Sequence, residues 1–234
     1  MLNWKRNTWR DVFNKLKWPL VVAGTTLVFC VLGFGFTQTL AAGGIALSIF
    51  LILGAVAVLA HRRLRTMPFA TWGMALAHAG LGVTVIGITA VTAWQTSKVL
   101  DMNPGQTVEL AGQQITLQSV ADVDGPNYHA NQARFRVVSH SGERVLISER
   151  RFYSSSGTQT TQAGIGTGLL GNIYIAIGDT DANGLVVRLW DHPFVDWIWA
   201  GALMMAFGGA LSLADRRFRL GAPARATTSV MAAA

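Results

Sequence analysis

Long apolar runs and one region of alternating character divide this chain into two kinds of segment. Almost uninterrupted apolar residues cover positions 18–36, 40–60, 70–93 and 194–214. A helix needs about 20 such residues to cross the hydrocarbon core of a bilayer, so each run is long enough to span one. The pattern therefore predicts four transmembrane helices, three of them within residues 18–93 and the fourth far along the chain.

Between the third and fourth runs, residues 95–190 change from a helical to an alternating hydrophobic period. Three pairs of strands are predicted around turns, in QTVELAGQQITLQSV, in ARFRVVS with ERVLISERRF, and in IYIAIGD with GLVVRLW. About six strands at this spacing predict a compact β-sandwich or barrel-like domain, covered by few or no helices.

The distribution of charge sets the expected orientation of the helices. The 234 residues are 51% hydrophobic and 13% charged, with a net charge of +7. Basic residues gather beside the apolar runs, in NWKRNTWRDVFNKLKW, HRRLR and DRRFR. The positive-inside rule assigns such segments to the cytoplasm, and all three lie on one side if every run crosses once. This clustering argues against a nucleic-acid-binding protein.

The expected fold class is a membrane protein with four transmembrane α-helices and a β-rich periplasmic domain inserted between helices 3 and 4. In a bacterial inner membrane both termini then lie in the cytoplasm. Residues 1–17 form a basic amphipathic segment, predicted to lie at the interface, and residues 215–234 a basic cytoplasmic tail. A cleaved signal peptide is the competing interpretation of the N-terminus, but the run 18–36 is longer than an ordinary signal core.

One cysteine and five histidines are the candidate ligands. Cys30 alone permits neither an intramolecular disulfide nor a CxxC haem-attachment motif. His61 belongs to a basic cluster beside a predicted membrane helix, which favours an interfacial position. His129 and His140 lie in predicted loops of the β-rich region, where we expect them to be solvated.

His78 differs because it lies inside an apolar run, roughly 12 Å from its start at 1.5 Å per residue. An ionisable side chain at this depth is costly and usually faces the bundle interior or a cavity. Neutral imidazole is a common metal and haem ligand, whereas a hydrogen bond to a neighbouring helix is the structural alternative. A lone histidine does not make a chelating metal site, but haem brings four donors of its own.

Helical geometry gives the segment around His78 two distinct faces. Small residues recur on one face and predict tight packing of a neighbouring helix. They are Gly73, Ala77, Gly80, Thr84 and Gly87. His78 points away from this stripe, and Gly82, one turn further on, is expected to leave space beside the imidazole for a flat hydrophobic ligand.

Two further features lie near the fourth apolar run. His192 stands close to Trp190, Trp197 and Trp199, in the position of an aromatic belt, and is a second candidate for contact with a bound group. The glycine-rich string at 164–171 lacks the Lys-Ser/Thr pair of a phosphate loop. We expect it to form a turn that uses the conformational freedom of glycine.

Three segments of the chain stand in an order and spacing that characterise one family. They are WGMALAHAGLGVTVIG, ERRFY…TQAGIGTGLLGNIYIAIGD and VVRLWDHPFVDWIWAGALMMAFGGALSLADRRFR, within residues 72–219. Together they resemble the C-terminal third of the CcmF/NrfE haem lyase family, membrane components of bacterial cytochrome c maturation. The resemblance implies that His78 is an axial ligand of a haem b held in the membrane.

The resemblance also implies a function and a set of partners. The chain is expected to be a haem-binding subunit of the haem lyase complex, which joins haem to the CxxCH thiols of apocytochrome c. Expected partners are the N-terminal CcmF portion or subunit, a CcmH-type subunit, the haem chaperone CcmE and apocytochrome c. The tryptophan-rich segment and the other membrane histidine of the family lie upstream of the matched part. We therefore expect the second axial ligand from a partner, and a chain that is catalytically incomplete alone.

Several alternatives remain open at this level. The chain is either a naturally separate C-terminal subunit or a truncated reading of a longer frame. Its function is alternatively that of a non-haem structural assembly factor whose His78 is hydrogen-bonded across helices. Docking of partners is expected at Arg150, Arg151 and Arg188 in the β-rich domain, and at the small-residue stripe with Gly201, Gly208 and Gly209 in the membrane.

Overall fold

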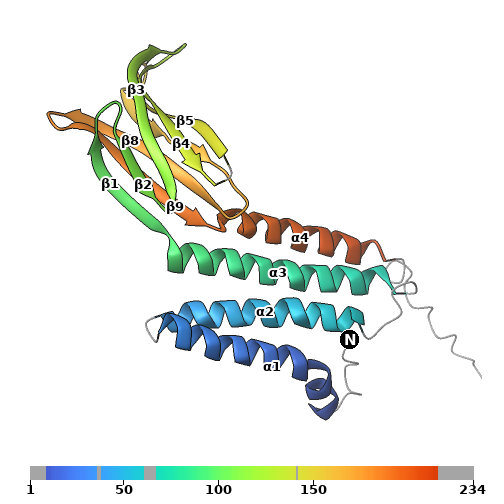
Figure 1. Cartoon of the computed structure of the whole chain (residues 1–234). Helices are drawn as coiled ribbons and strands as arrows, with labels where there is room; N and C mark the ends of the chain where they lie inside the picture. Colours follow the sequence, from blue (N-terminus) through green and yellow to red (C-terminus); the bar gives the residue numbers. More distant parts are fainter. Residues whose placement is uncertain (1–8, 36–37, 61–66, 141, 216–234) are drawn as a thin grey trace, which may run out of the picture.

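The computed structural model describes residues 9–35, 38–60, 67–140 and 142–215, divided between a helical layer and a β-domain (Figure 1). In this part of the chain, four helices are long and apolar enough to cross a membrane. They are α1 (Trp9–Phe34), α2 (Thr39–Ala60), α3 (Phe69–Trp94) and α4 (Val195–Leu213). Figure 1 shows them side by side in chain order, with the β-domain at the end where α3 finishes and α4 begins. The predicted class, four membrane helices with a β-rich insertion between the last two, is confirmed.

The N-terminal helix is longer than the first apolar run, because α1 already begins at Trp9 and continues through Pro19. The second half of the basic segment predicted at 1–17 is therefore continuous with the first apolar helix. Residues 1–8, His61 and the tail from 216 onwards lie outside the described residues.

Glycine brings α3 and α4 into backbone contact. A methyl group added at Gly80 would lie 2.7 Å from the carbonyl oxygen of Gly201, and one added at Gly208 would lie 2.6 Å from that of Gly73. Such distances leave no room for any larger side chain, as in the small-residue interfaces of membrane helices. The predicted stripe thus packs against α4 of the same chain. This corrects the expectation that the stripe, Gly201 and Gly208 would receive a partner's helices, whereas Gly209 has open space around it.

A buried carboxylate links the end of α4 to the start of α3, on the side of the helices away from the β-domain. Asp215, just past α4, accepts a hydrogen bond of 3.0 Å from the backbone N–H of Ala70 and is only 6% exposed. The residue that precedes α3, Pro68, offers no side-chain cap. Asp215 therefore satisfies a free N–H group at the start of α3, where the helix dipole also favours a negative charge.

The β-domain is a sandwich of two antiparallel sheets. Among the described residues there are nine strands, ordered β1-β9-β8-β7 in one sheet and β2-β3-β4-β5-β6 in the other. The first sheet contains β1 (Thr96–Met102), β7 (Gly164–Gly166), β8 (Gly171–Asp181) and β9 (Gly184–Pro193). The second contains β2 (Thr107–Leu110), β3 (Gln113–Asp124), β4 (His129–Ser139), β5 (Gly142–Tyr153) and β6 (Thr158–Gln162).

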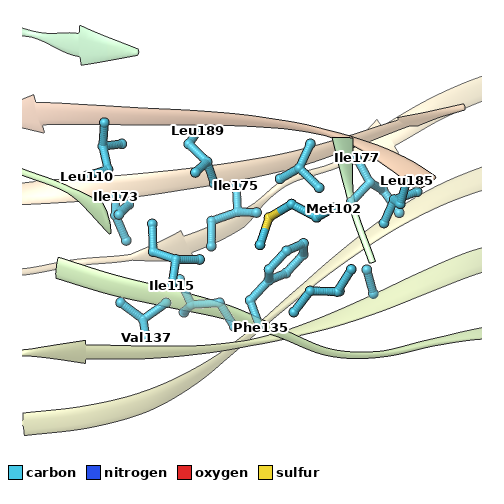
Figure 2. Packing of buried hydrophobic residues seen from close by; sticks show 14 residues of the cluster. Met102, Leu110, Ile115, Phe135, Val137, Ile173, Ile175, Ile177, Leu185 and Leu189 are labelled. Atoms are coloured by element: carbon cyan, nitrogen blue, oxygen red, sulfur yellow. The ribbon is translucent and has the colours of Figure 1, made fainter. Parts of the chain in front are cut away.

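The alternation of the sequence accounts for the core of the sandwich. Inward-facing residues of both sheets meet in one apolar cluster, shown in Figure 2. Its fully buried members include Ile115, Leu117, Phe135, Val137, Ile173, Ile175, Val187 and Leu189. Because successive side chains of a strand point to opposite faces, this single cluster sets the register of both sheets.

The prediction of about six strands is corrected to nine. The three predicted hairpins correspond to β2 with β3, β4 with β5, and β8 with β9. The strands that the sequence did not indicate are β1, β6 and β7, which lie at sheet edges. Every residue of β6 and most of β1 are exposed, so neither shows a buried alternating face, and β7 has only three residues, too few for a pattern to stand out in the sequence.

The sandwich is attached to the membrane helices by two single-residue connections. Gln95 alone separates α3 from β1, and Phe194 alone separates β9 from α4. These two strands are paired, with Thr96 opposite Asp191 at the membrane end of the ladder. The close pair of helices therefore continues directly into a close pair of strands.

The α3–α4 contact predicts the effect of a larger side chain at Gly80. Gly80→Val should force the helix backbones apart and lower the free energy of unfolding by about 1–3 kcal/mol or more, as overpacking does in well-packed interiors. The full chain in mixed detergent–SDS micelles, unfolded by increasing SDS, would measure this loss. Gly54→Val in α2 is the control, because a methyl group added there meets no atom within 4 Å. Equal losses in both variants would contradict the proposed role of the contact.

Candidate functional site

His78 lies within α3, roughly 14 Å from Phe69 along the helix, and its side chain is exposed. Its Nδ1 lies 2.8 Å from the backbone carbonyl oxygen of Met74, one turn earlier. A carbonyl only accepts, so Nδ1 must carry the proton and donate it. Nε2 then keeps its lone pair, which is the state in which imidazole binds a metal.

The hydrogen bond of His78 runs within its own helix. The structural alternative, in which His78 is bonded across to a neighbouring helix, has no such contact among the described residues. Two other side chains of the same face, Leu81 and Ile88, are 41% and 49% exposed. His78 thus stands on an apolar face of α3 that the described helices leave open.

The remaining faces of α3 are occupied by its two neighbours. The small-residue stripe meets α4, and a second line of residues meets α2. Gly44 of α2 packs against Thr89, and a methyl group added at Gly82 would lie 2.9 Å from the carbonyl oxygen of Ser48. These contacts leave the face of His78 as the exposed side of the helix.

The packing corrects the expectation for Gly82. This residue was expected to leave space for a ligand beside His78, but it is buried against α2. The side chain of Ile52 and the Ser48 carbonyl fill the volume beside it. The glycine is needed for the approach of α2, and the open surface near His78 is formed by other residues.

The donor set around His78 restricts the kinds of metal site that this chain alone can form. No group of three or more His, Cys, Asp or Glu side chains is placed to hold a metal ion in the described part of the chain. His78 is therefore suited to a group that brings its own donors. Haem fits this description, because the porphyrin supplies four nitrogens and the protein one or two.

His192 lies in the sandwich and not beside His78. It is on β9 next to the start of α4, where its ring meets that of Tyr174 edge to face at 5.2 Å between centroids. Its Nδ1 is buried and has no hydrogen-bond partner in the described residues. About 24 Å of helix separates His78 from Trp94 at the β-domain end, so the structure does not bring the two histidines together.

The other histidines of the β-domain belong to its surface, as expected. His129 is exposed, and its Nδ1 lies 2.5 Å from Asp124 Oδ1 across the β3–β4 turn. His140 is exposed in the turn between β4 and β5. Neither approaches the face of α3 that carries His78.

Two of the three arginines expected to dock partners are engaged within the domain. Arg150 forms an ion pair with Asp179, and Arg151 Nη2 lies 2.7 Å from Glu149 Oε2. Hydrogen bonds from Gln132 and Arg151 lower the pKa of Glu149. Arg188 is exposed on β9.

Comparison with known proteins identifies the family of this fold. The sequence model of a domain described as "CcmF C-terminal beta-sandwich" matches residues 93–193. The cytochrome c-type biogenesis protein CycK of Rhizobium meliloti is 38% identical over 242 residues, covering 97% of this chain and 36% of that protein. The protein CcmF of Escherichia coli is 34% identical over 226 residues, covering 94% of this chain and 35% of that protein.

A solved structure supports the same fold. The structure named cytochrome c heme lyase CcmF superposes with a TM-score of 0.73 at 15% identity, over 91% of this chain and 36% of that one. The fold thus defines a multi-pass membrane protein with a β-sandwich between its third and fourth described helices. The chain belongs to the CcmF family and corresponds to its C-terminal part. It spans little more than a third of the length of these relatives.

Burial at the membrane end of the sandwich predicts a pH effect. Desolvation raises the pKa of Asp191, against an opposing effect of His192. The pKa of Asp191 in the folded domain therefore lies above its value in the unfolded chain, about 3.9. The free energy of unfolding falls as the pH rises from the unfolded pKa through the folded pKa. Asp191→Asn should therefore make the β-domain more stable than the wild type at pH 7, and closer to it at pH 4.

Pulse proteolysis of the full chain in urea at both pH values would measure this difference. Asp101→Asn, at an exposed position of β1, is the matched control and should preserve the pH dependence of the wild type. A loss of stability in Asp191→Asn at pH 7 would contradict the assignment.

Proposed function

We propose that this chain is the haem-binding C-terminal part of a cytochrome c haem-ligation complex in a bacterial inner membrane. In this proposal His78 supplies one axial nitrogen to a membrane haem b. The observation that carries it is an exposed imidazole inside a membrane-spanning helix, with Nδ1–H bonded to Met74 and Nε2 left as the free ligand atom. The similarity to relatives named cytochrome c-type biogenesis proteins supports a role in the maturation of cytochrome c.

The energetics of the membrane favour a ligand at this position. An imidazole that faces hydrocarbon with a free Nε2 leaves a polar atom without a partner in a medium that offers none. Coordination of iron satisfies that atom. The neighbouring exposed residues, Leu81 and Ile88, present an apolar surface suited to a macrocycle.

The bond between His78 and Met74 has a defined role in this proposal. A hydrogen bond to the second ring nitrogen fixes the tautomer and the orientation of a ligating imidazole, and raises its basicity. Haem, when bound, supplies one-electron redox chemistry, and its axial ligands tune the potential. The contribution of this chain is then to hold one ligand at a fixed depth and rotation on α3.

The second axial ligand is proposed to come from outside the chain. His192 belongs to the sandwich, and the described residues place no other histidine on the open face of α3. The relatives are almost three times as long, and we propose that their N-terminal part, or an equivalent subunit, covers the face of His78. A CcmH-type subunit, the chaperone CcmE and apocytochrome c complete the proposed partners.

The proposed orientation follows the basic residues. We propose that both termini lie in the cytoplasm and the sandwich in the periplasm, because basic residues gather in the sequence before the first apolar run, between the second and third, and after the fourth. Ligation of haem to apocytochrome c is then proposed on the sandwich side. The chain is expected to be inactive without its partners.

The test is the visible spectrum of the full chain co-purified with the N-terminal portion that its longer relatives carry. Wild type should show a reducible low-spin b-type signal, because two strong nitrogen ligands complete the coordination of iron. His78→Ala should lose this signal or convert it to high spin. His140→Ala is the matched control, because it removes an exposed histidine from the β4–β5 turn of the sandwich and should leave the spectrum unchanged.

Chemical rescue sharpens the result. Imidazole added to His78→Gly should restore the low-spin spectrum, which a merely structural role of His78 would not produce. An identical spectrum in wild type and His78→Ala would remove His78 from the site. An intact complex with no haem would favour the structural assembly factor.

A further inference from the structure

The connection between β7 and β8 exposes two large apolar side chains. We call residues 167–170, with the sequence TGLL, the leucine loop. Leu169 is 80% exposed and Leu170 68%. Among the described large hydrophobic residues of the β-domain these are the most exposed, ahead of Val99 at 65%. Two adjacent exposed leucines on this domain indicate an interaction site, since exposed apolar patches commonly mark such sites.

Hydrogen bonds place the leucine loop at the level where α4 begins. The carbonyl oxygen of Leu170 accepts a bond of 2.9 Å from the backbone N–H of Phe194, the residue that precedes α4. The carbonyl oxygen of Leu169 accepts one of 3.0 Å from the indole Nε1 of Trp197, in the first turn of α4. The loop therefore lies beside the first turn of a membrane-spanning helix.

The loop is held rigidly in this position. The backbone N–H of Gly168 donates to Asn172 Oδ1 at 3.0 Å, and Asn172 Nδ2 donates to Asp196 Oδ1 at 2.8 Å. Asn172 is only 4% exposed, so this link is part of the interior. A methyl group added at Gly171 would lie 3.0 Å from the carbonyl oxygen of His192. The glycine-rich string thus ends in a packed junction and not in a free turn.

The surface around the leucine loop is continuous with that of the membrane helices. Leu169 lines one apolar cleft together with Val83 of α3 and with Trp197 and Ala200 of α4. Further along α4, Leu203 is 72% exposed. The two leucines extend the apolar surface of the helices onto the base of the sandwich. An indole at the end of a spanning helix, such as that of Trp197, is typical of the bilayer interface.

We propose that the leucine loop inserts Leu169 and Leu170 into the interfacial region of the bilayer, in the leaflet on the side of the sandwich. The partner is lipid, because the loop is fixed at the level of the first turn of α4 and continues its lipid-facing surface. The insertion holds the base of the sandwich against the membrane. This inference depends on the membrane topology alone and stands apart from the binding of haem.

Site-directed spin labelling tests the depth of the loop. The full chain, with its single cysteine replaced by Cys30→Ser, would carry labels at Leu169→Cys or Leu170→Cys in nanodiscs of phosphatidylethanolamine and phosphatidylglycerol. Two reference sites bracket the scale. Leu203→Cys reports the hydrocarbon, and Phe152→Cys, 45% exposed at the far end of β5, reports water. The measured quantity is the ratio of collision rates with oxygen and with a water-soluble nickel chelate.

We expect this ratio at both leucines to be several-fold higher than at Phe152 and nearer to the value at Leu203. A ratio equal to that at Phe152 would overturn the proposal. A second measurement needs no substitution in the loop. A phosphatidylethanolamine with a diazirine near the glycerol end of its acyl chain should photolabel the wild-type peptide that contains Leu169 and spare the one that contains Phe152. Equal labelling of both peptides, or of neither, would equally count against insertion.

Discussion

The backbone contact between α3 and α4 is the constraint from which the rest of the structure follows. In lipid, apolar side chains gain little by leaving the solvent, so helices associate through close packing and polar contacts. Gly80 and Gly201 supply that packing across more than a hundred residues of intervening chain, and Asp215 closes the far end of the pair. Because one residue separates each helix from its strand, the same contact brings β1 beside β9 and starts the sandwich.

Helices α4 and α2 pack against two faces of α3, and the face that carries His78 remains exposed among the described residues. Both neighbours approach through glycine, α4 at Gly80 and α2 at Gly82, so they lie close and leave no gap beside the helix. His78 stands between these contact lines, and its hydrogen bond within the described residues is made to its own helix. In the proposed function, this arrangement holds the Nε2 atom of His78 at a defined position on the open face, and a partner covers that face.

Much of this could be predicted from the sequence, where a local rule decided the outcome. The length of each apolar run predicted the helices, the alternation predicted the hairpins such as β2 with β3, and depth singled out His78. The predictions failed where the outcome depends on a residue or strand that is distant in sequence but adjacent in the fold. Gly82 is a small residue near His78 in sequence, but only the position of α2 shows that Ser48 and Ile52 fill the space beside it. The edge strand β6 has no buried face, so its pairing could not be read from hydrophobic pattern.

The glycine-rich string at 164–171 shows a further limit of prediction from sequence. Its glycines were expected to form a turn, but they also permit close packing against neighbouring backbone. Gly171 allows the β7–β8 connection to pack against the β9–α4 junction, which directs two leucines toward the level of the membrane surface. The short connections at Gln95 and Phe194 transmit that position to the helices. About 24 Å of α3 lies between Trp94 and His78, and a helix of this length keeps its rise per residue. If the sandwich is seated in the interface as proposed, its short connections to α3 and α4 also set the depth of the His78 imidazole in the membrane.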